Sequence, residues 1–482
     1  MHFRPHDYQK EAIRFLSSNP NSGIFADPGL GKTAIALSLI SRLKEKIPNY
    51  RCLIIAPLTV CYNVWPNEIA KWKQFRHLDY GILHNEWMED IACPYQEQLD
   101  VLTDADLDIY LINPESLKWL FANLPNWYSR FPFNHLIIDE STRFKNWKAK
   151  RCSLLRKYLP RFKRRNIMTG TPIPNSLLDL FSQMFMVDRG VSLGKRIVPF
   201  RDTYFKKTGY KGYQWKAREH AQGEIEQRIA DSVIRIDEED HLEVPELIEN
   251  PVYVSLPDEI QKIYDEIEAS FFATIEDEDI AIPTEPSKYN VCRQIANGGL
   301  YKPTEFLTLP KNRKTFLLHT SKAQALENIQ NELNGKPVLV GYHYRFVVPH
   351  LKKYFKAPNL AYISSGVDQR QTKLYIRLWN SNRLPILLGQ PQSIGHGLNL
   401  QKSDCKDIVW YGVPDNFESY DQFNRRVKRQ GSKQKKITAH ILIARNTIEP
   451  VIWRRLKKKD TNQRSLLKAL KRYWKKKRKG LL

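Results

Sequence analysis

The sequence predicts an α/β protein with two parallel-sheet domains and a mainly helical insertion between them. Its 482 residues exceed what one hydrophobic core usually holds, so at least two domains are expected. Two series of short apolar runs alternate with helical patterns, as is typical of parallel sheets covered on both faces. We expect the first domain over residues 1–190, the insertion and linker over 191–310, and the second domain over 311–482.

The elements follow from these runs in chain order. The first series reads CLIIAP, IYLINP and HLIIDE, with the helical pattern VWPNEIAKW after the first run. The second series reads PVLVGY, LAYIS, PILLGQ, DIVWYG and ITAHILIA. Between the two series lie basic and aromatic residues, an amphipathic helix near 257–272 and the acidic, Pro-containing link EDEDIAIPTEP. This middle stretch predicts a helical insertion followed by a flexible joint.

The charge balance restricts the class of partner. The chain has 76 Lys and Arg against 52 Asp and Glu, a formal charge of +24, which suits nucleic acid or an anionic membrane.

No apolar run approaches the roughly 18 residues of a membrane helix, and no signal peptide is visible at the start. The six cysteines form no C-x-x-C pair and the 12 histidines show no metal-ligand spacing. A soluble intracellular protein without a zinc site is expected.

A phosphate-binding loop is predicted in SGIFADPGLGKTAIALSLI, which reads as a buried strand, a Gly-rich loop and a helix. Gly29 and Gly31 let backbone N–H groups point at phosphate oxygens. Lys32 would supply a cation to the β- and γ-phosphates, and the Thr33 hydroxyl would ligate Mg²⁺. A kinase, a switch GTPase and a motor ATPase can all carry such a loop.

An acidic pair helps to choose among these classes. Asp139 and Glu140 end the apolar run HLIIDE, about a hundred residues after the phosphate loop. In a motor ATPase, Asp139 would hold the Mg²⁺ with its water shell, and Glu140 would orient and deprotonate the attacking water. The pair alone is a weak signal, but its position after the loop favours the motor.

Two arginines in QFNRRVKRQGS form a third candidate group. Arg426 and Arg429 are three residues apart, and they share one face if the segment is helical. They could reach a γ-phosphate as arginine fingers and neutralise the charge that develops during transfer. A solvated basic helix is the alternative, and the position after the second series of strands favours the fingers.

The order of these motifs resembles the superfamily-two helicase-related ATPases of the Swi/Snf type, in particular their compact phage and bacterial forms. The matching segments are RPHDYQKEAI, ADPGLGKT, LIIAPLTVCYNVWPNEI, DESTRFKN, MTGTPIPN, RQIANGGLY, SIGHGLNLQ, QFNRRVKRQGS and NTIEPVI. The resemblance implies two RecA-like domains, ATP as substrate, Mg²⁺ as cofactor and DNA as partner. Two departures from the nuclear remodellers are DEST for Asp-Glu-Ala-His, and Lys428 and Ser432 for the usual His and Gln. Neither departure changes the expected metal or finger residues.

The resemblance also assigns roles to further residues. Gln9 would read the adenine edge, and Gly397, Asn399 and Gln422 would complete the nucleotide face of the second domain. The TGTPIPN segment, residues 169–175, would couple the nucleotide state to the DNA. Loops after the strands would contact the DNA backbone through Thr59, Asn113, Lys145, Arg345 and Arg370.

The function implied by the resemblance is an ATP-dependent DNA translocase or helicase. It would hydrolyse ATP between two RecA-like domains to move along or remodel DNA, with unwinding and branch migration left open. Duplex or branched DNA, bound without sequence preference, is the expected partner of a monomer in the cytoplasm of a bacterium or a phage-infected host. An RNA helicase of the same superfamily and a non-hydrolytic nucleic-acid clamp are the alternatives.

Two basic segments have two interpretations each. Residues 195–218 interleave Lys and Arg with six aromatic residues, which could grip DNA and stack on its bases or form the core of the insertion. Residues 454–479 carry fourteen Lys and Arg against Asp460. They could be an electrostatic anchor or a solvated terminal helix.

Overall fold

The computed structural model of the chain contains two compact units, Met1–Leu242 and Glu243–Lys458, and each is described by itself. The structure describes residues 1–84, 94–104, 106–124, 131–174, 176–208, 214–238, 244–270, 272–275, 278–281, 285–302, 314–364, 366–394, 398–414, 416–429 and 431–458.

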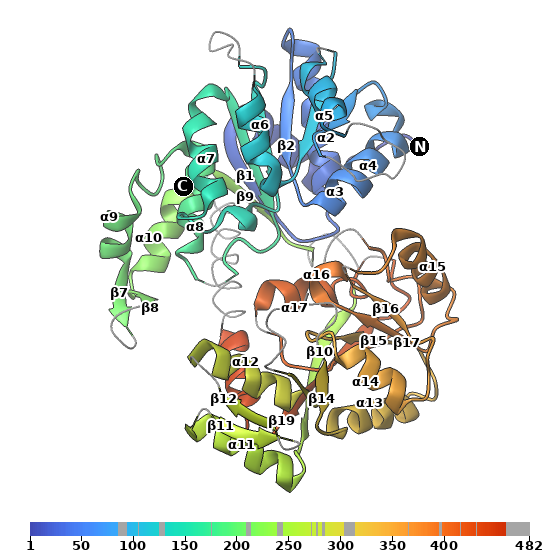
Figure 1. The fold of residues 1–482 in the computed structure, drawn as a ribbon. Coiled ribbons are helices and arrows are strands. Elements are labelled where there is room, and N and C mark those ends of the chain that lie inside the picture. Colours follow the sequence, from blue (N-terminus) through green and yellow to red (C-terminus); the bar gives the residue numbers. More distant parts are fainter. Residues whose placement is uncertain are drawn as a thin grey trace. The chain divides into compact units, whose positions relative to one another are not determined.

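Unit 1 is built on a parallel sheet of seven strands in the order β3-β4-β2-β5-β6-β1-β9 (Figure 1). Every neighbouring pair is parallel, so the carboxyl ends of the strands lie along one edge of the sheet. The strands are β1 (Asn21–Ala26), β2 (Cys52–Ile55), β3 (Tyr80–Ile82), β4 (Ile109–Ile112), β5 (His135–Asp139), β6 (Arg164–Thr169) and β9 (Val233–Ile236).

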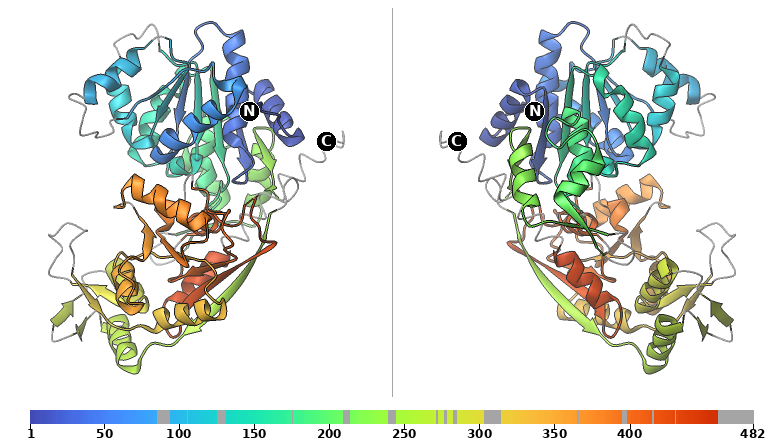
Figure 2. Two further views of the ribbon diagram at one scale, coloured as in Figure 1. Left: turned by 90° about the vertical axis from the view of Figure 1, so that its right-hand side faces the viewer. Right: turned by 90° about the vertical axis from the view of Figure 1, so that its left-hand side faces the viewer.

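Helices cover both faces of this sheet, which explains why its strands are apolar on both sides. Successive residues of β2 alternate between two cores, with Ile54 in one and Leu53 and Ile55 in the other. Figure 2 shows the sheet of unit 1 between its two layers of helices.

The core of Ile54 contains α1 (Asp7–Ser18), α2 (Lys32–Lys46), α3 (Leu58–Asn63), α4 (Trp65–Lys71) and η1 (Lys73–Phe75). The other core contains α5 (Pro94–Thr103), α6 (Leu117–Asn123), α7 (Lys150–Tyr158), α8 (Asp179–Asp188), α9 (Ile197–Tyr204), α10 (Ala221–Ile229), η3 (Ser141–Phe144) and η4 (Leu159–Arg161). The short turn η2 (Pro114–Ser116) follows β4, and β7 (Phe205–Thr208) and β8 (Gln214–Ala217) form a separate hairpin.

Unit 2 has a six-stranded parallel sheet in the order β10-β19-β18-β15-β17-β16. Its strands are β10 (Glu246–Val254), β15 (Val338–Gly341), β16 (Ala361–Ile363), β17 (Ile386–Gly389), β18 (Asp407–Trp410) and β19 (Lys436–Ala444). One face is covered by α13 (Ser321–Glu332) and α14 (Val347–Tyr354). The other is covered by α15 (Gln369–Asn380), α16 (Pro391–Ile394), α17 (Phe417–Asn424) and the helical residues 449–458.

A smaller apolar cluster in unit 2 joins α11 (Asp258–Ser270) to α12 (Glu285–Ala296). Two short antiparallel pairs accompany these helices, β11 (Phe272–Ile275) with β12 (Glu278–Ala281), and β13 (Gly299–Tyr301) with β14 (Thr315–Leu317). Part of the acidic link at residues 276–286, expected as a flexible joint, therefore forms β12.

The structure confirms two parallel sheets with helices on both faces. The apolar runs quoted from the sequence are strands β2, β4, β5 and β15 to β19. Residues 191–310, which the sequence presents as one insertion, are shared between the units, because β9 pairs with β1 and β10 pairs with β19. Strand β9 escaped prediction because Arg235 interrupts its short apolar run. Within the described residues, no helix has the length and apolar character needed to cross a membrane.

Candidate functional site

The carboxyl edge of the unit 1 sheet brings three of the predicted motifs together. Strands β5, β6 and β1 are neighbours, and their carboxyl ends carry the acidic pair, the TGTPIPN segment and the phosphate loop. In open parallel sheets this edge is where ligands bind. The strand order therefore assembles residues from positions 27, 139 and 170 of the chain.

The phosphate loop has the left-handed backbone that its glycines permit. Gly29 has φ 95° and Gly31 has φ 75°, and Gly31 caps the start of α2. A Cβ added at Gly31 would lie 2.6 Å from Gln9 Nε2, so a larger residue would clash as well as strain the backbone. The strand, loop and helix predicted around Lys32 are confirmed.

The side chains of Gln9 and Lys32 both donate hydrogen bonds to backbone carbonyls of this loop. The Gln9 side chain is buried, donates from Nε2 to the Leu30 carbonyl at 3.1 Å and accepts from the His6 N–H at 2.9 Å. Lys32 Nζ donates to the carbonyls of Ala26 at 2.8 Å and of Asp27 at 3.3 Å. The lysine ammonium is thus held at the end of β1, within the loop.

A buried ion pair ties the loop to strand β9. Arg235 Nη2 donates to Asp27 Oδ1 at 2.8 Å, and Arg235 Nη1 donates to the Phe25 carbonyl at 3.0 Å. The Glu238 N–H donates to the other oxygen of Asp27 at 3.0 Å. The sequence reading missed Arg235, although a charged residue inside the run VIRI was a signal that could have found it.

The acidic pair occupies two different backbone environments. Asp139 is buried, and burial together with the charge of Glu140 raises its pKa to about 7, against the lowering effect of Lys32. The Trp65 indole donates to Asp139 Oδ2 at 3.2 Å. Glu140 has φ 56° and ψ 61°, a left-handed conformation that non-glycine residues adopt at a cost and that often marks functional positions. Trp65 is a second residue that the sequence reading did not single out.

The TGTPIPN segment contacts both other motifs. A Cβ added at Gly170 would lie 3.1 Å from Pro28 Cδ, so the segment lies directly against the phosphate loop. Gln183 of α8 donates to the Pro172 carbonyl at 2.7 Å and accepts from Ser141 Oγ at 2.7 Å. The buried amide of Gln183 therefore links the segment to the residue after the acidic pair, while Asn175 lies outside the described residues.

The groups at this edge fit a phosphate chain and its metal. Within the described part of the chain, no hydrogen bond is found for the N–H groups of Gly29, Leu30 and Gly31, which can therefore donate to phosphate oxygens. A carboxylate from Asp139 and a hydroxyl from Thr33 are oxygen ligands of the kind that Mg²⁺ prefers.

Unit 2 groups the predicted arginines by turns and not by a helix. α17 ends at Asn424 and residues 425–429 form turns and bends, so the helix on which Arg426 and Arg429 would share one face is not present. Both nevertheless contact one segment, since Arg426 Nη1 donates to the Leu398 carbonyl at 3.4 Å and Arg429 Nη1 donates to Asn399 Oδ1 at 2.8 Å.

Of Gln422 and Gly397, which are also expected at the nucleotide face of unit 2, the structure describes only Gln422. Gln422 is buried on α17, and its carbonyl accepts from Arg426 Nε at 3.2 Å. Gly397 lies outside the described residues.

The five candidate DNA contacts all come after the carboxyl end of a strand in the chain, but Thr59 and Arg370 lie on helices α3 and α15 and not on loops. In unit 1, Thr59 lies on α3 with its side chain outside the description, and Lys145 is partly exposed after η3. Asn113 is only 7% exposed and donates to Glu115 Oε2 at 3.4 Å, so its side chain is mostly turned inward. In unit 2, Arg345 and Arg370 are exposed. Their contact with DNA stays a prediction.

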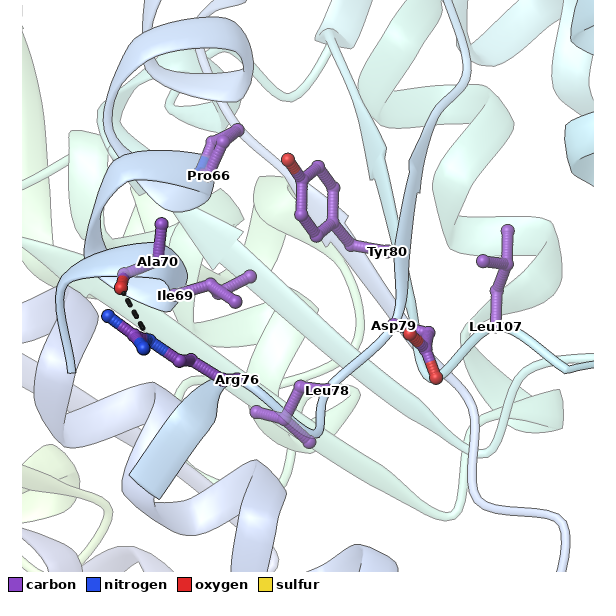
Figure 3. A pocket seen from close by; sticks show the side chains of 8 residues that line it. All are labelled: Pro66, Ile69, Ala70, Arg76, Leu78, Asp79, Tyr80 and Leu107. Carbon is purple, nitrogen blue, oxygen red and sulfur yellow. Dashed lines mark hydrogen bonds between the residues drawn. The ribbon is translucent and has the colours of Figure 1, made fainter. Parts of the chain in front are cut away.

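A hollow of about 630 Å³ in unit 1 lies apart from this edge (Figure 3). It is lined by apolar side chains such as Ile69 and Leu78, with Tyr80 across from α4. The Arg76 side chain beside it donates to the Ala70 carbonyl at 3.0 Å. It shares no residue with the phosphate loop or the acidic pair, so it is not part of the site assembled above.

Comparison with known proteins decides the family. The family model of the SNF2-related domain matches residues 8–296, from α1 to the end of α12. The chain belongs to the SNF2-related family. Protein p41 of Acyrthosiphon pisum secondary endosymbiont phage 1 is 31% identical over an alignment of 486 positions, which covers 98% of this SNF2-related chain and 99% of p41.

Two further matches are more distant in sequence. An uncharacterized ATP-dependent helicase of Mycoplasma pneumoniae is 25% identical over 92% of this chain, and the chain spans only 40% of that helicase. The solved SWI2/SNF2 ATPase core of Sulfolobus solfataricus, in complex with dsDNA, has a TM-score of 0.42 at 18% identity and covers 98% of this chain and 95% of its own.

Proposed function

We propose that this SNF2-related protein is a DNA-dependent ATPase that uses ATP hydrolysis to move along or remodel duplex or branched DNA. The observation that carries the proposal is the meeting of the phosphate loop, the acidic pair and the TGTPIPN segment at one sheet edge. Membership of the SNF2-related family supports the same reading, as does the formal charge of +24.

The residues of unit 1 would bind ATP and activate water. Lys32 and the loop N–H groups would hold the β- and γ-phosphates, and Gln9 would contact the adenine. When bound through Thr33 and Asp139, Mg²⁺ would neutralise charge on the phosphates. Glu140 would accept the proton of the water whose oxygen forms the new bond to the γ-phosphorus.

The residues of unit 2 would act on the same step. The bond from the γ-phosphorus to the oxygen bridging to the β-phosphate breaks as the water adds, and negative charge builds on the transferred group. Arg426 and Arg429 would neutralise that charge during hydrolysis, with Gln422 and Gly397 beside the nucleotide. ATP hydrolysis would in this way alternate two states of the pair of units, and repeated alternation would produce movement along DNA.

DNA would be held by its backbone. Thr59, Asn113 and Lys145 in unit 1 and Arg345 and Arg370 in unit 2 are side chains of the types that bind phosphates without reading sequence. The proposal therefore includes indifference to DNA sequence. No specific observation favours an RNA helicase or a non-hydrolytic clamp.

The test is ATP turnover by the full chain with matched single-stranded, duplex and four-way-junction DNA and with duplex RNA, all at one salt concentration. We expect duplex or junction DNA to stimulate turnover at least as strongly as single strands. The Lys32→Ala variant serves as the control for contaminating ATPases. Stimulation by RNA alone would overturn the proposal, and stimulation by single strands alone would replace it with a strand-separating helicase.

A further inference from the structure

The β7–β8 hairpin of unit 1 is a basic element that the proposed site does not use. It belongs to residues 195–218, which contain eight Lys and Arg against one acid, Asp202. In Figure 1 it extends from the left-hand side of unit 1, beyond α9, and it pairs with neither large sheet. A two-stranded hairpin is marginally stable by itself, so its neighbours and its charges determine whether it persists.

The four aromatic residues of this segment that the structure describes are buried or partly buried, which separates them from the charges. Phe200, Tyr204 and Phe205 are buried in the core of unit 1, and the Phe200 ring lies 4.9 Å from the ring of Phe181 on α8. The partly buried Trp215 ring lies 5.5 Å from the Arg201 guanidinium. The rings that are described therefore anchor the hairpin, and they do not form an open stacking platform.

The lysines point the other way and repel one another. Lys206 and Lys216 are directly opposite in the antiparallel register and are both exposed. Like charges directly opposite each other on one face destabilise a strand pair. Among the described residues, neither lysine takes part in an ion pair, and the connecting sequence GYKGY adds Lys211 and no acid. An uncompensated pair of cations on an anchored hairpin fits a polyanionic partner.

We propose that the β7–β8 hairpin is a second contact surface for the DNA backbone, in which Lys206 and Lys216 bind neighbouring phosphates outside the ATPase machinery. Opposite lysine Cβ atoms are about 5 Å apart in such a pair, a spacing that two flexible side chains can match to phosphates along a strand. The described hairpin residues offer no exposed large apolar side chain of the kind that inserts into a membrane interface, which favours DNA over a lipid surface. This inference rests on the proposed DNA-dependent function.

The test compares the double variant Lys206→Ala/Lys216→Ala with wild type and with the control Lys46→Ala/Lys163→Ala. The control removes two exposed lysines away from the site, Lys46 at the end of α2 and Lys163 just before the amino end of β6. The affinity for a duplex is measured by fluorescence anisotropy over a range of salt concentrations. ATP turnover is measured against DNA concentration.

We expect the hairpin variant to bind duplex DNA roughly tenfold more weakly at low salt, with a salt slope smaller by about 1 to 2, because each lost phosphate contact removes about 0.9 from that slope. The turnover without DNA and the maximal turnover at saturating DNA should not change, while the DNA concentration for half-maximal stimulation should rise. The melting temperature should stay the same or rise, since a repulsion is removed. If the double variant does not fold, Lys206→Gln and Lys216→Gln should each show about half the change in salt slope.

Two results would overturn the inference while leaving the ATPase proposal intact. One is a salt slope equal to that of the wild type in a variant whose turnover is still DNA-stimulated. The other is unchanged DNA binding together with lost binding to vesicles of phosphatidylserine and phosphatidylcholine. Failure of the wild type to respond to any DNA would instead overturn the proposed function itself.

Discussion

Strand β5 carries a buried ionisable group at each end, and the two ends of this one strand differ in how those groups are satisfied. At its amino end, both ring nitrogens of His135 are hydrogen-bonded inside the protein, Nδ1 to Tyr50 Oη at 2.5 Å and Nε2 to Asn166 Oδ1 at 2.7 Å. At its carboxyl end, Asp139 is a buried carboxylate that feels the charges of Glu140 and of the Lys32 ammonium.

Burial disfavours the charged form of both groups, but the consequence differs between the two ends of β5. Burial lowers the pKa of His135 to about 3, so the ring stays neutral and its hydrogen bonds hold the amino edge together. Burial raises the pKa of Asp139 to about 7, so the same physical effect leaves a carboxylate whose charged form needs a cation. The buried group at the amino end is satisfied within the protein, while a bound cation would stabilise the charged form of the buried group at the carboxyl end.

The largest expected effect comes from the carboxyl end. Glu140→Gln should lower ATP turnover about a thousandfold, because an amide cannot accept the proton of the attacking water. The melting temperature and the affinity for DNA should stay close to those of the wild type, since Glu140 is partly exposed. Steady-state turnover assays check this, with the exposed Glu45→Gln as the matched control. Normal turnover by Glu140→Gln would show that the carboxyl end of β5 has no catalytic role.

The second largest effect on turnover is expected from the two candidate arginine fingers of unit 2. Arg426→Ala and Arg429→Ala should each lower kcat about a hundredfold with little change in the KM for ATP, because these cations act on charge that develops in the transition state. Arg425→Ala is the control, since Arg425 is paired with Asp421 at 2.8 Å. A change confined to KM would make the two arginines ordinary binding groups.

A smaller effect is expected from the residue that holds Asp139. Trp65→Phe keeps the buried ring but removes the indole donor to Asp139, so we expect the Mg²⁺ concentration for half-maximal turnover to rise about tenfold. Trp72→Phe is a matched control, because its indole donates to Glu68 at 2.7 Å, away from the site. An equal response of both variants to Mg²⁺ would mean that the Trp65 contact is only structural.

The smallest effect on activity, and the clearest on stability, is expected at the amino end. The folded pKa of His135 is about 3 and its ordinary value is 6.5, so protonation favours the unfolded state. Its contribution to stability is complete above pH 6.5 and decreases as the pH falls toward 3. From pH 7 to pH 5 this one group should reduce the free energy of unfolding by about 2 kcal/mol.

Denaturant titrations over this pH range measure that contribution. His135→Gln should flatten the pH dependence and lower the overall stability, while turnover per folded molecule at pH 7 stays near that of the wild type. The exposed His77→Gln is the matched control for the loss of one imidazole. A large loss of turnover in folded His135→Gln would show that the two ends of β5 are not separate in function.

The motifs and most of the strands could be predicted from the sequence, because each is encoded by residues that are close together along the chain. GLGKT requires glycines at left-handed positions, and buried parallel strands are short apolar runs bounded by turns. The contacts of Asp27 with Arg235 and of Asp139 with Trp65 could not be predicted, since each joins residues that the sheet order brings together from distant positions. The conformation at Arg426 and Arg429 stayed open for a similar reason, because spacing alone does not show that α17 ends at Asn424.

The most direct test of the central claim is ATP turnover with saturating duplex DNA, measured side by side for the wild type and Glu140→Gln. The account predicts that duplex DNA raises wild-type turnover well above its DNA-free rate and leaves Glu140→Gln near background. An absence of wild-type turnover under these conditions, or equal turnover by the two proteins, would contradict the claim that this sheet edge hydrolyses ATP in response to DNA.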